Sequence, residues 1–287
     1  MAKQKLVMIG NGMAGLRTIE EILERSQSQF DITIIGKEPY PNYNRIMLSN
    51  ILQKKMTVED TIMNPYDWYQ ENNIELINND PVEKVDKENK IVTTSKGIEV
   101  EYDICIFATG SKAFVLPIPG SNLPSVIGWR TIDDTNKMIE IAQTKKRAVV
   151  IGGGLLGLEC ARGLLDQGME VTVLHLADWL MEMQLDRKAG EMLKADLEKQ
   201  GMKIELQANS KEIIGDKDVE AIKLADGRVI ETDLVVMAVG IRPYTEVAKD
   251  SGLDVNRGIV VNDYMQTSDS HIYAVCESAE HEGKVYG

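Results

Sequence analysis

The sequence is poor in cysteine, and the few cysteines it has are scattered. Its 287 residues include three, Cys105, Cys160 and Cys276, and no two of them form a C-x-x-C pair. A disulfide framework or a zinc site needs more closely spaced ligands, so the spacing argues against both. Iron–sulfur clusters need groups of cysteines, which this chain does not supply. Few, scattered thiols are typical of a reducing compartment, and we expect a cytoplasmic protein.

The sequence also lacks a long apolar run and a surplus of positive charge. No apolar stretch approaches the roughly 20 residues that span a bilayer. The basic start MAKQKLVMIG runs into a glycine turn, where a signal peptide would stay apolar. The formal net charge is -13, with 45 acidic and 32 basic side chains. Phosphate backbones and anionic membranes repel such a chain, so we expect it to bind neither nucleic acid nor membrane.

What the sequence does contain is a glycine-rich turn close to its start. Residues 6–9 are an apolar run of the length of a buried parallel strand, and a helical pattern follows at 16–23. Between them stands G-x-G-x-x-G, formed by Gly10, Gly12 and Gly15. These glycines allow a tight turn, close approach of the backbone to a pyrophosphate, and close helix packing. The strand–turn–helix context predicts a dinucleotide site at the helix N-terminus.

The same pattern returns in the second half of the chain. Residues 148–159 read AVVIGGGLLGLE, with Gly152, Gly154 and Gly157 at the spacing of the first motif. The helix that follows would offer the N–H groups around Leu155 and Leu156 to a second pyrophosphate. Two dinucleotide sites in one chain favour hydride transfer between two bound cofactors.

Two further strands repeat one another as well. The buried strand predicted at 104–108 ends in Thr109-Gly110, and the strand predicted at 234–239 ends in Gly240. A glycine at that point lets the edge of a ligand approach the backbone, although an ordinary turn at the end of a strand also explains it. The repeat favours two domains of one design.

The order of these patterns predicts an α/β fold with two Rossmann-like domains. Their parallel sheets carry β-meander insertions, and the second domain is inserted in the first. Proline and glycine at 112–123 and again at 241–243 mark the crossings between them. We expect residues 1–117 plus 243–287 to form the first dinucleotide-binding domain and residues 118–242 the second.

Two charged residues near the first motif are candidates for ligand contacts. Glu38 stands two residues beyond Gly36, which ends the strand predicted at 30–35, and a carboxylate there holds ribose hydroxyls in dinucleotide folds. Arg45 lies in the segment 39–50, which its proline and asparagine content predicts to be a loop. Arginine binds pyrophosphate through paired donors. An ordinary loop carboxylate and a solvated arginine remain the alternatives.

One residue after the strand predicted at 170–174 bears on the choice of nicotinamide cofactor. A carboxylate at this position favours NADH and an arginine favours NADPH. The residue is His175, with no arginine beside it and with Asp178 three residues on. The sequence therefore favours NADH and leaves NADPH open.

Four landmarks give the sequence a family resemblance over nearly its whole length. They are GNGMAG at Gly10, ATG at Ala108, GGGLLGLE at Gly152 and TSDSHIYAVCESAEH at Thr267. Together they resemble the flavin-dependent pyridine nucleotide oxidoreductases with two nucleotide-binding domains. The resemblance implies FAD at the first glycine turn and NADH or NADPH at the second.

Finer features are similar to one subgroup, the N-terminal flavoprotein module of the large subunit of assimilatory NAD(P)H nitrite reductase. These features are EPYPNYNRIMLS, HLADWLMEMQLD and ESAEHEGKVYG. The resemblance implies transfer of hydride to FAD, and delivery of electrons to downstream redox centres or a small subunit. Implied FAD contacts are Gly10, Gly12, Met13, Ala14, Gly15, Glu38, Arg45, Val82, Ala108, Thr109, Gly110 and Glu277; implied NAD(P)H contacts are Gly152, Gly154, Leu155, Leu156, Gly157, Glu159, His175 and Gly240.

Some of these roles have simpler explanations, and the chain departs from the family in places. Glu159 is implied near the nicotinamide, but a carboxylate in the first turns of a helix is also favoured by the helix dipole. Cys276 stands where the family usually has glycine, just before the acidic Glu277 that lies along the ribityl chain. The cysteine pair that disulfide reductases carry near residues 40–50 is absent, which excludes a dithiol relay.

The sequence stops at Gly287, where the family continues. The resemblance implies that the iron–sulfur cluster and sirohaem belong to a missing C-terminal part, and that this chain alone does not reduce nitrite. Three alternatives stay open: a ferredoxin or rubredoxin reductase, an NADH oxidase-like flavoenzyme, and a non-catalytic nucleotide-binding fragment.

Overall fold

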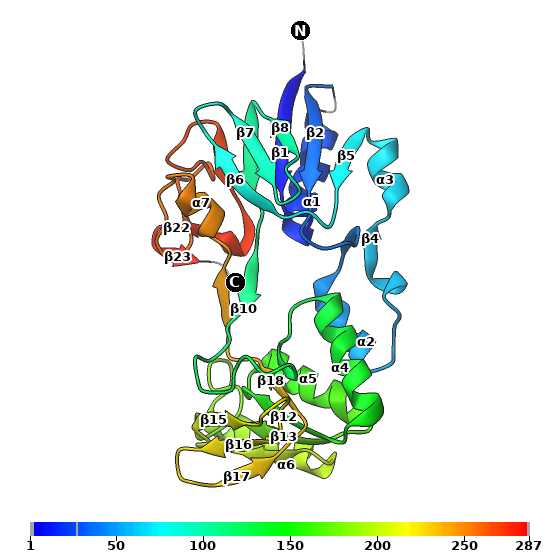
Figure 1. Ribbon diagram of the computed structural model, residues 1–287, viewed down its shortest axis with the longest axis vertical. Coiled ribbons are helices and arrows are strands. Elements are labelled where there is room, and N and C mark those ends of the chain that lie inside the picture. The colour runs from blue at the N-terminus through cyan, green and yellow to red at the C-terminus, as the bar shows by residue number, and fades with distance from the viewer. Residues whose placement is uncertain (1–2, 27, 286–287) are drawn as a thin grey trace. The chain divides into compact units, whose positions relative to one another are not determined.

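The computed structural model describes residues 3–26 and 28–285 (Figure 1). The last two residues of ESAEHEGKVYG and the first two of MAKQKLVMIG lie outside the described residues. The chain divides into two compact units. Unit 1 comprises Met1–Asn44, Ile62–Lys112 and Arg242–Gly287, and unit 2 comprises Arg45–Thr61 and Ala113–Ile241.

Unit 1 is built on a parallel five-stranded sheet in the order β21-β9-β1-β2-β5. Its strands are β1 (Gln4–Ile9), β2 (Phe30–Ile35), β5 (Ile74–Ile77), β9 (Ile104–Phe107) and β21 (Ile272–Ala274). Ile9 pairs with Ile35 on one side and with Phe107 on the other. The strands flanking β1 therefore end level with it, and the segments that follow them meet at one edge of the sheet.

One side of this sheet packs on helices and the other on an antiparallel layer. Leu16 and Ile19 of helix α1 share a buried cluster with Leu6 and Met8 of β1. In a second cluster, Val7 packs with apolar residues of the three-stranded sheet β6-β7-β8. Helices α1 (Met13–Ser26) and α3 (Tyr66–Glu71) lie on the helical side, whereas Ala248 of α7 (Glu246–Asp250) belongs to the second cluster. The other strands of unit 1 are β3 (Asn42–Tyr43), β4 (Ile62–Asn64), β6 (Val82–Asp86), β7 (Ile91–Thr94), β8 (Glu99–Glu101), β20 (Ile259–Val261), β22 (Ala279–His281) and β23 (Lys284–Val285), with a 3-10 turn η3 (Cys276–Ser278).

Unit 2 repeats this design with a parallel sheet in the order β11-β18-β12-β13-β14. An antiparallel sheet, β15-β16-β17, packs with it through residues such as Ile213 and Ile222. Its strands are β11 (Val126–Gly128), β12 (Arg147–Ile151), β13 (Glu170–Leu174), β14 (Lys203–Glu205), β15 (Ser210–Ile214), β16 (Ala221–Leu224), β17 (Val229–Glu231) and β18 (Leu234–Met237). Its helices are α2 (Leu48–Leu52), α4 (Ile132–Thr144), α5 (Leu155–Asp166) and α6 (Arg187–Lys199), with 3-10 turns η1 (Arg45–Met47) and η2 (Glu59–Thr61).

The chain passes between the units at Asn44/Arg45, Thr61/Ile62, Lys112/Ala113 and Ile241/Arg242. The last two passages run through β10 (Ser111–Ala113) and β19 (Ile241–Pro243), which pair as a two-stranded sheet. They fall within or beside the proline- and glycine-rich segments of the sequence. The first two passages carry residues 45–61 into unit 2, whereas the sequence analysis assigned them to the first domain.

The prediction that 39–50 is a loop is wrong in its second half. Arg45–Met47 form a 3-10 turn and Leu48–Leu52 form helix α2. Leu52 is fully buried against Gly163 of α5, where a Cβ would lie 2.5 Å from its Cγ. Gln167 also donates to the Leu52 carbonyl at 2.7 Å. This packing across more than 100 residues of sequence stabilises a helix that local composition does not favour.

Most of the remaining elements agree with the sequence, and the α/β class with parallel sheets and antiparallel insertions is confirmed. Thr131 caps α4 in a capping box, and Gly227 has φ +93° in the turn between β16 and β17. The short elements β6, β15 and α7 were not predicted. No helix in the described ranges is long and apolar enough to cross a membrane.

Candidate functional site

In unit 1 the first glycine turn lies at the carboxyl edge of the sheet. Gly10 follows β1 with φ +115°, and its N–H donates to the Ile35 carbonyl at 2.8 Å. A Cβ at Gly10 would lie 2.2 Å from the carbonyl oxygen of Ala108, so only glycine fits. Ala108 in turn donates to Ile9 at 2.8 Å. The predicted ATG segment and the predicted turn therefore touch directly.

The other two glycines of the motif differ in what surrounds them. A Cβ at Gly15 would lie 3.0 Å from Ala108 Cβ, so this glycine lets α1 pack close to the sheet. A Cβ at Gly12 would meet nothing within 4 Å. Gly12 leads into Met13 and Ala14, the first residues of α1, and its carbonyl accepts from Leu16 at 3.0 Å. Gly12 thus opens onto free space at a helix N-terminus.

Glu277 reaches the same edge from the far end of the chain. Val275 donates to the Phe107 carbonyl at 2.9 Å, which places the end of β21 beside the end of β9. The hydroxyl of Ser111 then donates to Glu277 Oε2 at 2.6 Å. Thr109 Oγ1 donates to the Tyr244 carbonyl at 2.8 Å, and Gly110 has φ +63°. Segments far apart in sequence thus gather around the glycine turn.

Cys276, the residue before Glu277, has φ +71°. This is the left-handed region, where glycine is favoured and a residue with a Cβ is strained. The backbone therefore gives a physical reason why glycine suits this position. The other two cysteines are different: Cys105 and Cys160 are fully buried, and burial raises the pKa of both thiols well above the ordinary value.

A polar network beneath the first turn was missed by the sequence analysis. The Tyr69 hydroxyl donates to Asn11 Oδ1 at 2.8 Å and accepts from the Asn42 N–H at 3.1 Å. Asn42 Nδ2 donates back to the Asn11 carbonyl at 3.1 Å. Burial raises the pKa of Tyr69, so the phenol stays protonated as a donor. Asn11 stands inside the glycine motif, but nothing in the local sequence links it to Tyr69.

The remaining candidates of the first site are placed as follows. Glu38 lies in the loop after β2 and accepts from the Tyr43 hydroxyl at 2.7 Å. Val82 is buried at the start of β6, opposite Thr94. Arg45 belongs to unit 2, and its guanidinium donates to the Arg130 carbonyl at 2.9 Å.

The second glycine turn in unit 2 repeats the first in detail. Gly152 has φ +120°, and its N–H donates to the Leu174 carbonyl at 2.8 Å. A Cβ there would lie 2.3 Å from the Ala238 carbonyl oxygen, as at Gly10 and Ala108. A Cβ at Gly157 would lie 1.9 Å from the Gly152 carbonyl oxygen, so α5 packs closely here.

The middle glycine of the second motif again opens onto free space. Gly154 would carry a Cβ with nothing within 4 Å, and it begins α5. Leu155 and Leu156, the first helical residues, are 60% and 47% exposed although both are apolar. Glu159 is half-buried one turn further on. Gly240, with φ +115°, follows β18 at the same edge of the sheet.

His175 follows β13, but its side chain is buried and turned toward the glycine turn. The Gly153 N–H donates to His175 Nδ1 at 3.1 Å. Nε2 lies 3.0 Å from the Trp179 carbonyl oxygen and 2.9 Å from Glu182 Oε2. Glu182 was not among the sequence candidates, because no motif marks a carboxylate seven residues beyond His175.

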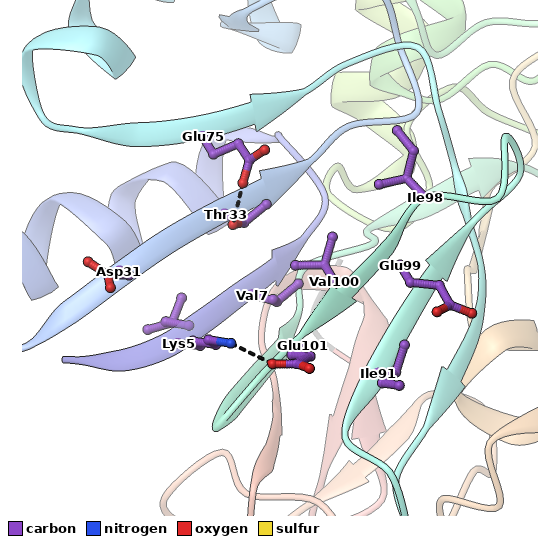
Figure 2. A pocket seen from close by; sticks show the side chains of 11 residues that line it. Lys5, Val7, Asp31, Thr33, Glu75, Ile91, Ile98, Glu99, Val100 and Glu101 are labelled. Atoms are coloured by element: carbon purple, nitrogen blue, oxygen red, sulfur yellow. Dashed lines mark hydrogen bonds and ion pairs between the residues drawn. The ribbon is translucent and has the colours of Figure 1, made fainter. Parts of the chain in front are cut away.

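A cavity of about 500 Å³ opens elsewhere on unit 1 (Figure 2). It is lined by residues of the parallel strands β1, β2 and β5 and of the antiparallel strands β7 and β8. Lys5 pairs with Glu101 at 2.5 Å, and Thr33 donates to Glu75 at 3.1 Å, as the dashed lines show. None of the predicted site residues lines it. Within the described ranges, no group of three or more His, Cys, Asp or Glu residues is arranged to hold a metal ion.

Comparison with known proteins decides the family. The model of the pyridine nucleotide-disulphide oxidoreductases matches residues 4–285.

The chain belongs to this family.

Nitrite reductase [NAD(P)H] of Bacillus subtilis is 56% identical over all 287 residues, which cover 36% of that protein. The assimilatory nitrate reductase electron transfer subunit of B. subtilis is 45% identical over the whole chain and 37% of its own length. The nitrite reductase (NADH) large subunit of Escherichia coli is 39% identical, with 34% of its length covered. The chain thus spans about a third of the length of these relatives.

Two solved structures of oxidoreductases share the fold. The ferredoxin reductase of the CYP199A2 system from Rhodopseudomonas palustris matches with a TM-score of 0.91 at 29% identity, over 98% of this chain and 69% of that one. NADH:rubredoxin oxidoreductase of Clostridium acetobutylicum matches with a TM-score of 0.83 at 32% identity, over 99% and 70%. The predicted resemblance to pyridine nucleotide oxidoreductases, and to nitrite reductase within them, is confirmed. Despite the family's name, this member has no cysteine pair at the first helix.

Proposed function

We propose that this chain is an electron-input module that transfers hydride from NAD(P)H to FAD. The observation that carries the proposal is the repeated turn, in which an open-faced glycine begins a helix at the carboxyl edge of a parallel sheet. Dinucleotides bind at the carboxyl ends of parallel strands, at the point where the strand order of the sheet reverses. Relatives named as NAD(P)H nitrite reductases and as an electron transfer subunit support the same activity.

We assign FAD to unit 1, and the residues fit it. The free space at Gly12 leaves room for a pyrophosphate beside the first N–H groups of α1. Bound FAD supplies a two-electron acceptor that then gives up single electrons. Glu277, whose carboxylate accepts from the Ser111 hydroxyl, would hold the ribityl chain, and Glu38 would accept from ribose hydroxyls. Further contacts are proposed for Gly10, Met13, Ala14, Gly15, Val82, Ala108, Thr109 and Gly110, and for Arg45 of unit 2 at the phosphate or adenine.

We assign NAD(P)H to unit 2. The N–H groups of Leu155 and Leu156 bind its pyrophosphate, and their exposed side chains cover apolar ligand surface. Glu159 lies near the nicotinamide in this proposal. The protein positions the reacting carbon for hydride transfer and excludes water, and no side-chain acid or base is needed for this half-reaction. The other proposed contacts are Gly152, Gly154, Gly157, His175 and Gly240.

The onward path of the electrons lies outside this chain in our proposal. We place the iron–sulfur cluster and sirohaem in the remaining two thirds of the longer relatives, and nitrite reduction in the full-length enzyme or with a small subunit. We also place the protein in the cytoplasm, since buried thiols such as Cys105 and Cys160 suit a reducing compartment. A second candidate is a rubredoxin or ferredoxin reductase, favoured by the likeness to NADH:rubredoxin oxidoreductase. Reduction of added rubredoxin by the NADH-treated protein would distinguish it.

The experiment uses the two open glycines as a matched pair. Because a Cβ at Gly12 or Gly154 meets no protein atom within 4 Å, alanine at either position should change the free energy of unfolding by less than about 1 kcal/mol. The added methyl occupies the space proposed for a pyrophosphate. We expect Gly12→Ala to weaken FAD binding about tenfold or more and leave NADH binding unchanged. Gly154→Ala should do the opposite.

Both affinities are measured by fluorescence titration of the purified chain. If both variants bind FAD and NADH as the wild type does, the proposal fails. If Gly154→Ala weakens FAD and Gly12→Ala weakens NADH, the assignment of the cofactors to the units is reversed.

A further inference from the structure

In unit 2, the residue expected to bind the adenosine ribose already forms hydrogen bonds within the protein. The ribose contact in such folds comes from the residue that follows the second strand of the unit. That residue is His175, whose side chain is buried. Its main chain is held on both sides, because its N–H donates to Glu205 and its carbonyl accepts from Ala208, each at 2.9 Å. The imidazole therefore has a fixed orientation.

The hydrogen bonds of His175 define its tautomer. Because the Gly153 N–H donates to Nδ1 at 3.1 Å, Nδ1 is an acceptor, and the ring proton resides on Nε2. The Nε2–H then points to the Trp179 carbonyl oxygen and to Glu182 Oε2. Both ring nitrogens are used within the protein. A ribose hydroxyl could bond to this ring only by displacing one of these partners.

Glu182 has what His175 lacks, a free acceptor facing solvent. Its side chain is 35% exposed, and Oε2 is fixed by the histidine at 2.9 Å. None of the described residues donates to its other oxygen. One imidazole ring separates this carboxylate from Gly153 in the glycine turn. The carboxylate is thus anchored to the motif through His175.

The loop that carries Glu182 is itself fixed to the turn. Met181 donates to the Gly153 carbonyl at 3.1 Å and has φ +57°, an unusual conformation for a residue with a long side chain. Leu180 is fully buried, and its Cδ2 would lie 2.6 Å from a Cβ at Gly153. The residue before Glu182 is therefore held in a strained backbone state by the same glycine. This arrangement orients the carboxylate on a rigid support.

Arg187, five residues beyond Glu182, is already paired with other side chains. Arg187 pairs with Asp178, lies 3.9 Å from Glu191, and stacks over the Trp179 ring at 4.8 Å from its centroid. The cation is thus shared between Asp178 and Glu191. A phosphate brought beside Glu182 would meet a like charge, whereas a hydroxyl would meet an acceptor.

We propose that Glu182 accepts the 2′-hydroxyl of the adenosine ribose and makes the site selective for NADH over NADPH, with His175 as its positioning residue. This inference rests on the proposed binding of NAD(P)H to unit 2. It moves the ribose contact from His175, which follows β13, to a carboxylate seven residues further on.

The test compares ADP-ribose with 2′-phospho-ADP-ribose, which differ only at the 2′ position and need no flavin. Binding to the full chain is measured by calorimetry, or by fluorescence of Trp179 and the other tryptophans. We expect the wild type to prefer ADP-ribose and Glu182→Gln to lose about tenfold or more of that preference. Glu198→Gln removes the same charge from the exposed face of α6, and should leave the preference unchanged.

A variant of His175 separates positioning from mere stability. His175→Asn should lower the preference in the wild-type background and leave it unaltered in Glu182→Gln, because the histidine acts through the glutamate. A general loss of structure would weaken the binding of both ligands equally and would not change the ratio of their dissociation constants. If Glu182→Gln keeps the wild-type preference, or if the wild type binds both ligands equally, the inference is overturned and the nucleotide site stands. If the wild type binds neither ligand, the proposed function of unit 2 fails first.

Discussion

Cys276 provides a quantitative test of how the carboxyl edge of the parallel sheet in unit 1 is built. Its φ of +71° lies in the left-handed region, where a residue other than glycine pays about 1–2 kcal/mol. Glycine removes that strain, but it loses about 0.5–1 kcal/mol more backbone entropy on folding. We therefore expect Cys276→Gly to raise the free energy of unfolding by about 0.5–1 kcal/mol.

Cys276→Ala is the matched control, because it removes the sulfur and its contacts but keeps the Cβ and the strain. Urea unfolding, followed by tryptophan fluorescence, should find the glycine variant about 1 kcal/mol more stable than the alanine variant. The glycine variant should also bind FAD more tightly, since the side chain next to Glu277 is gone. Equal stability of the two variants, or a more stable alanine variant, would refute the reasoning from φ.

Two other predictions concern stability. Gly157→Ala would bring a Cβ to 1.9 Å from a backbone carbonyl oxygen, so we expect it to lower the free energy of unfolding by about 3 kcal/mol or more. Gly154→Ala, the control, should lower it by less than about 1 kcal/mol, with both values measured by urea unfolding. Glu280 is buried; burial opposes its ionisation, but N–H donors from Gly258, Asn256 and Arg257 outweigh this and hold its pKa below the ordinary value. Ionised Glu280 therefore stabilises the fold fully at pH values above about 4.3, the pKa of a glutamate in the unfolded chain. This contribution is lost as the pH falls through the lower pKa of Glu280 in the folded protein. We expect Glu280→Gln to lower the free energy of unfolding by about 1–3 kcal/mol at neutral pH, and to make that free energy fall less steeply as the pH is lowered. If the free energy of unfolding depends on acid pH as it does in the wild type, the prediction is contradicted.

The glycine turns could be predicted because the physics that requires them is local. Gly10 and Gly152 need a positive φ and a close approach to a carbonyl oxygen, and both needs appear in sequence as glycine after an apolar run. The start of α4 has a local cause too, because Thr131 and Asp134 form a capping box there. The residues involved lie within a few positions of one another, so these features can be recognised from the sequence alone.

The elements that escaped prediction depend on distant partners. Helix α2 is stabilised because Leu52 packs on Gly163, and no local pattern reports that contact. The Asn11–Tyr69 hydrogen bond joins a turn to a helix 58 residues away. The hydrogen bonds of the His175 ring were not predictable for a similar reason. Its place after β13 was evident, but the direction of its ring depends on Gly153 and on a loop that the sequence left without structure.

The central claim is that one chain binds both cofactors and passes hydride between them. The most direct measurement is the visible spectrum of the FAD-reconstituted protein without oxygen, before and after stoichiometric NADH. We predict that the protein retains flavin absorption after free FAD is removed, and that this absorption decreases when NADH is added. A protein that takes up no FAD, or a bound flavin that stays oxidised although NADH binds, would contradict the claim.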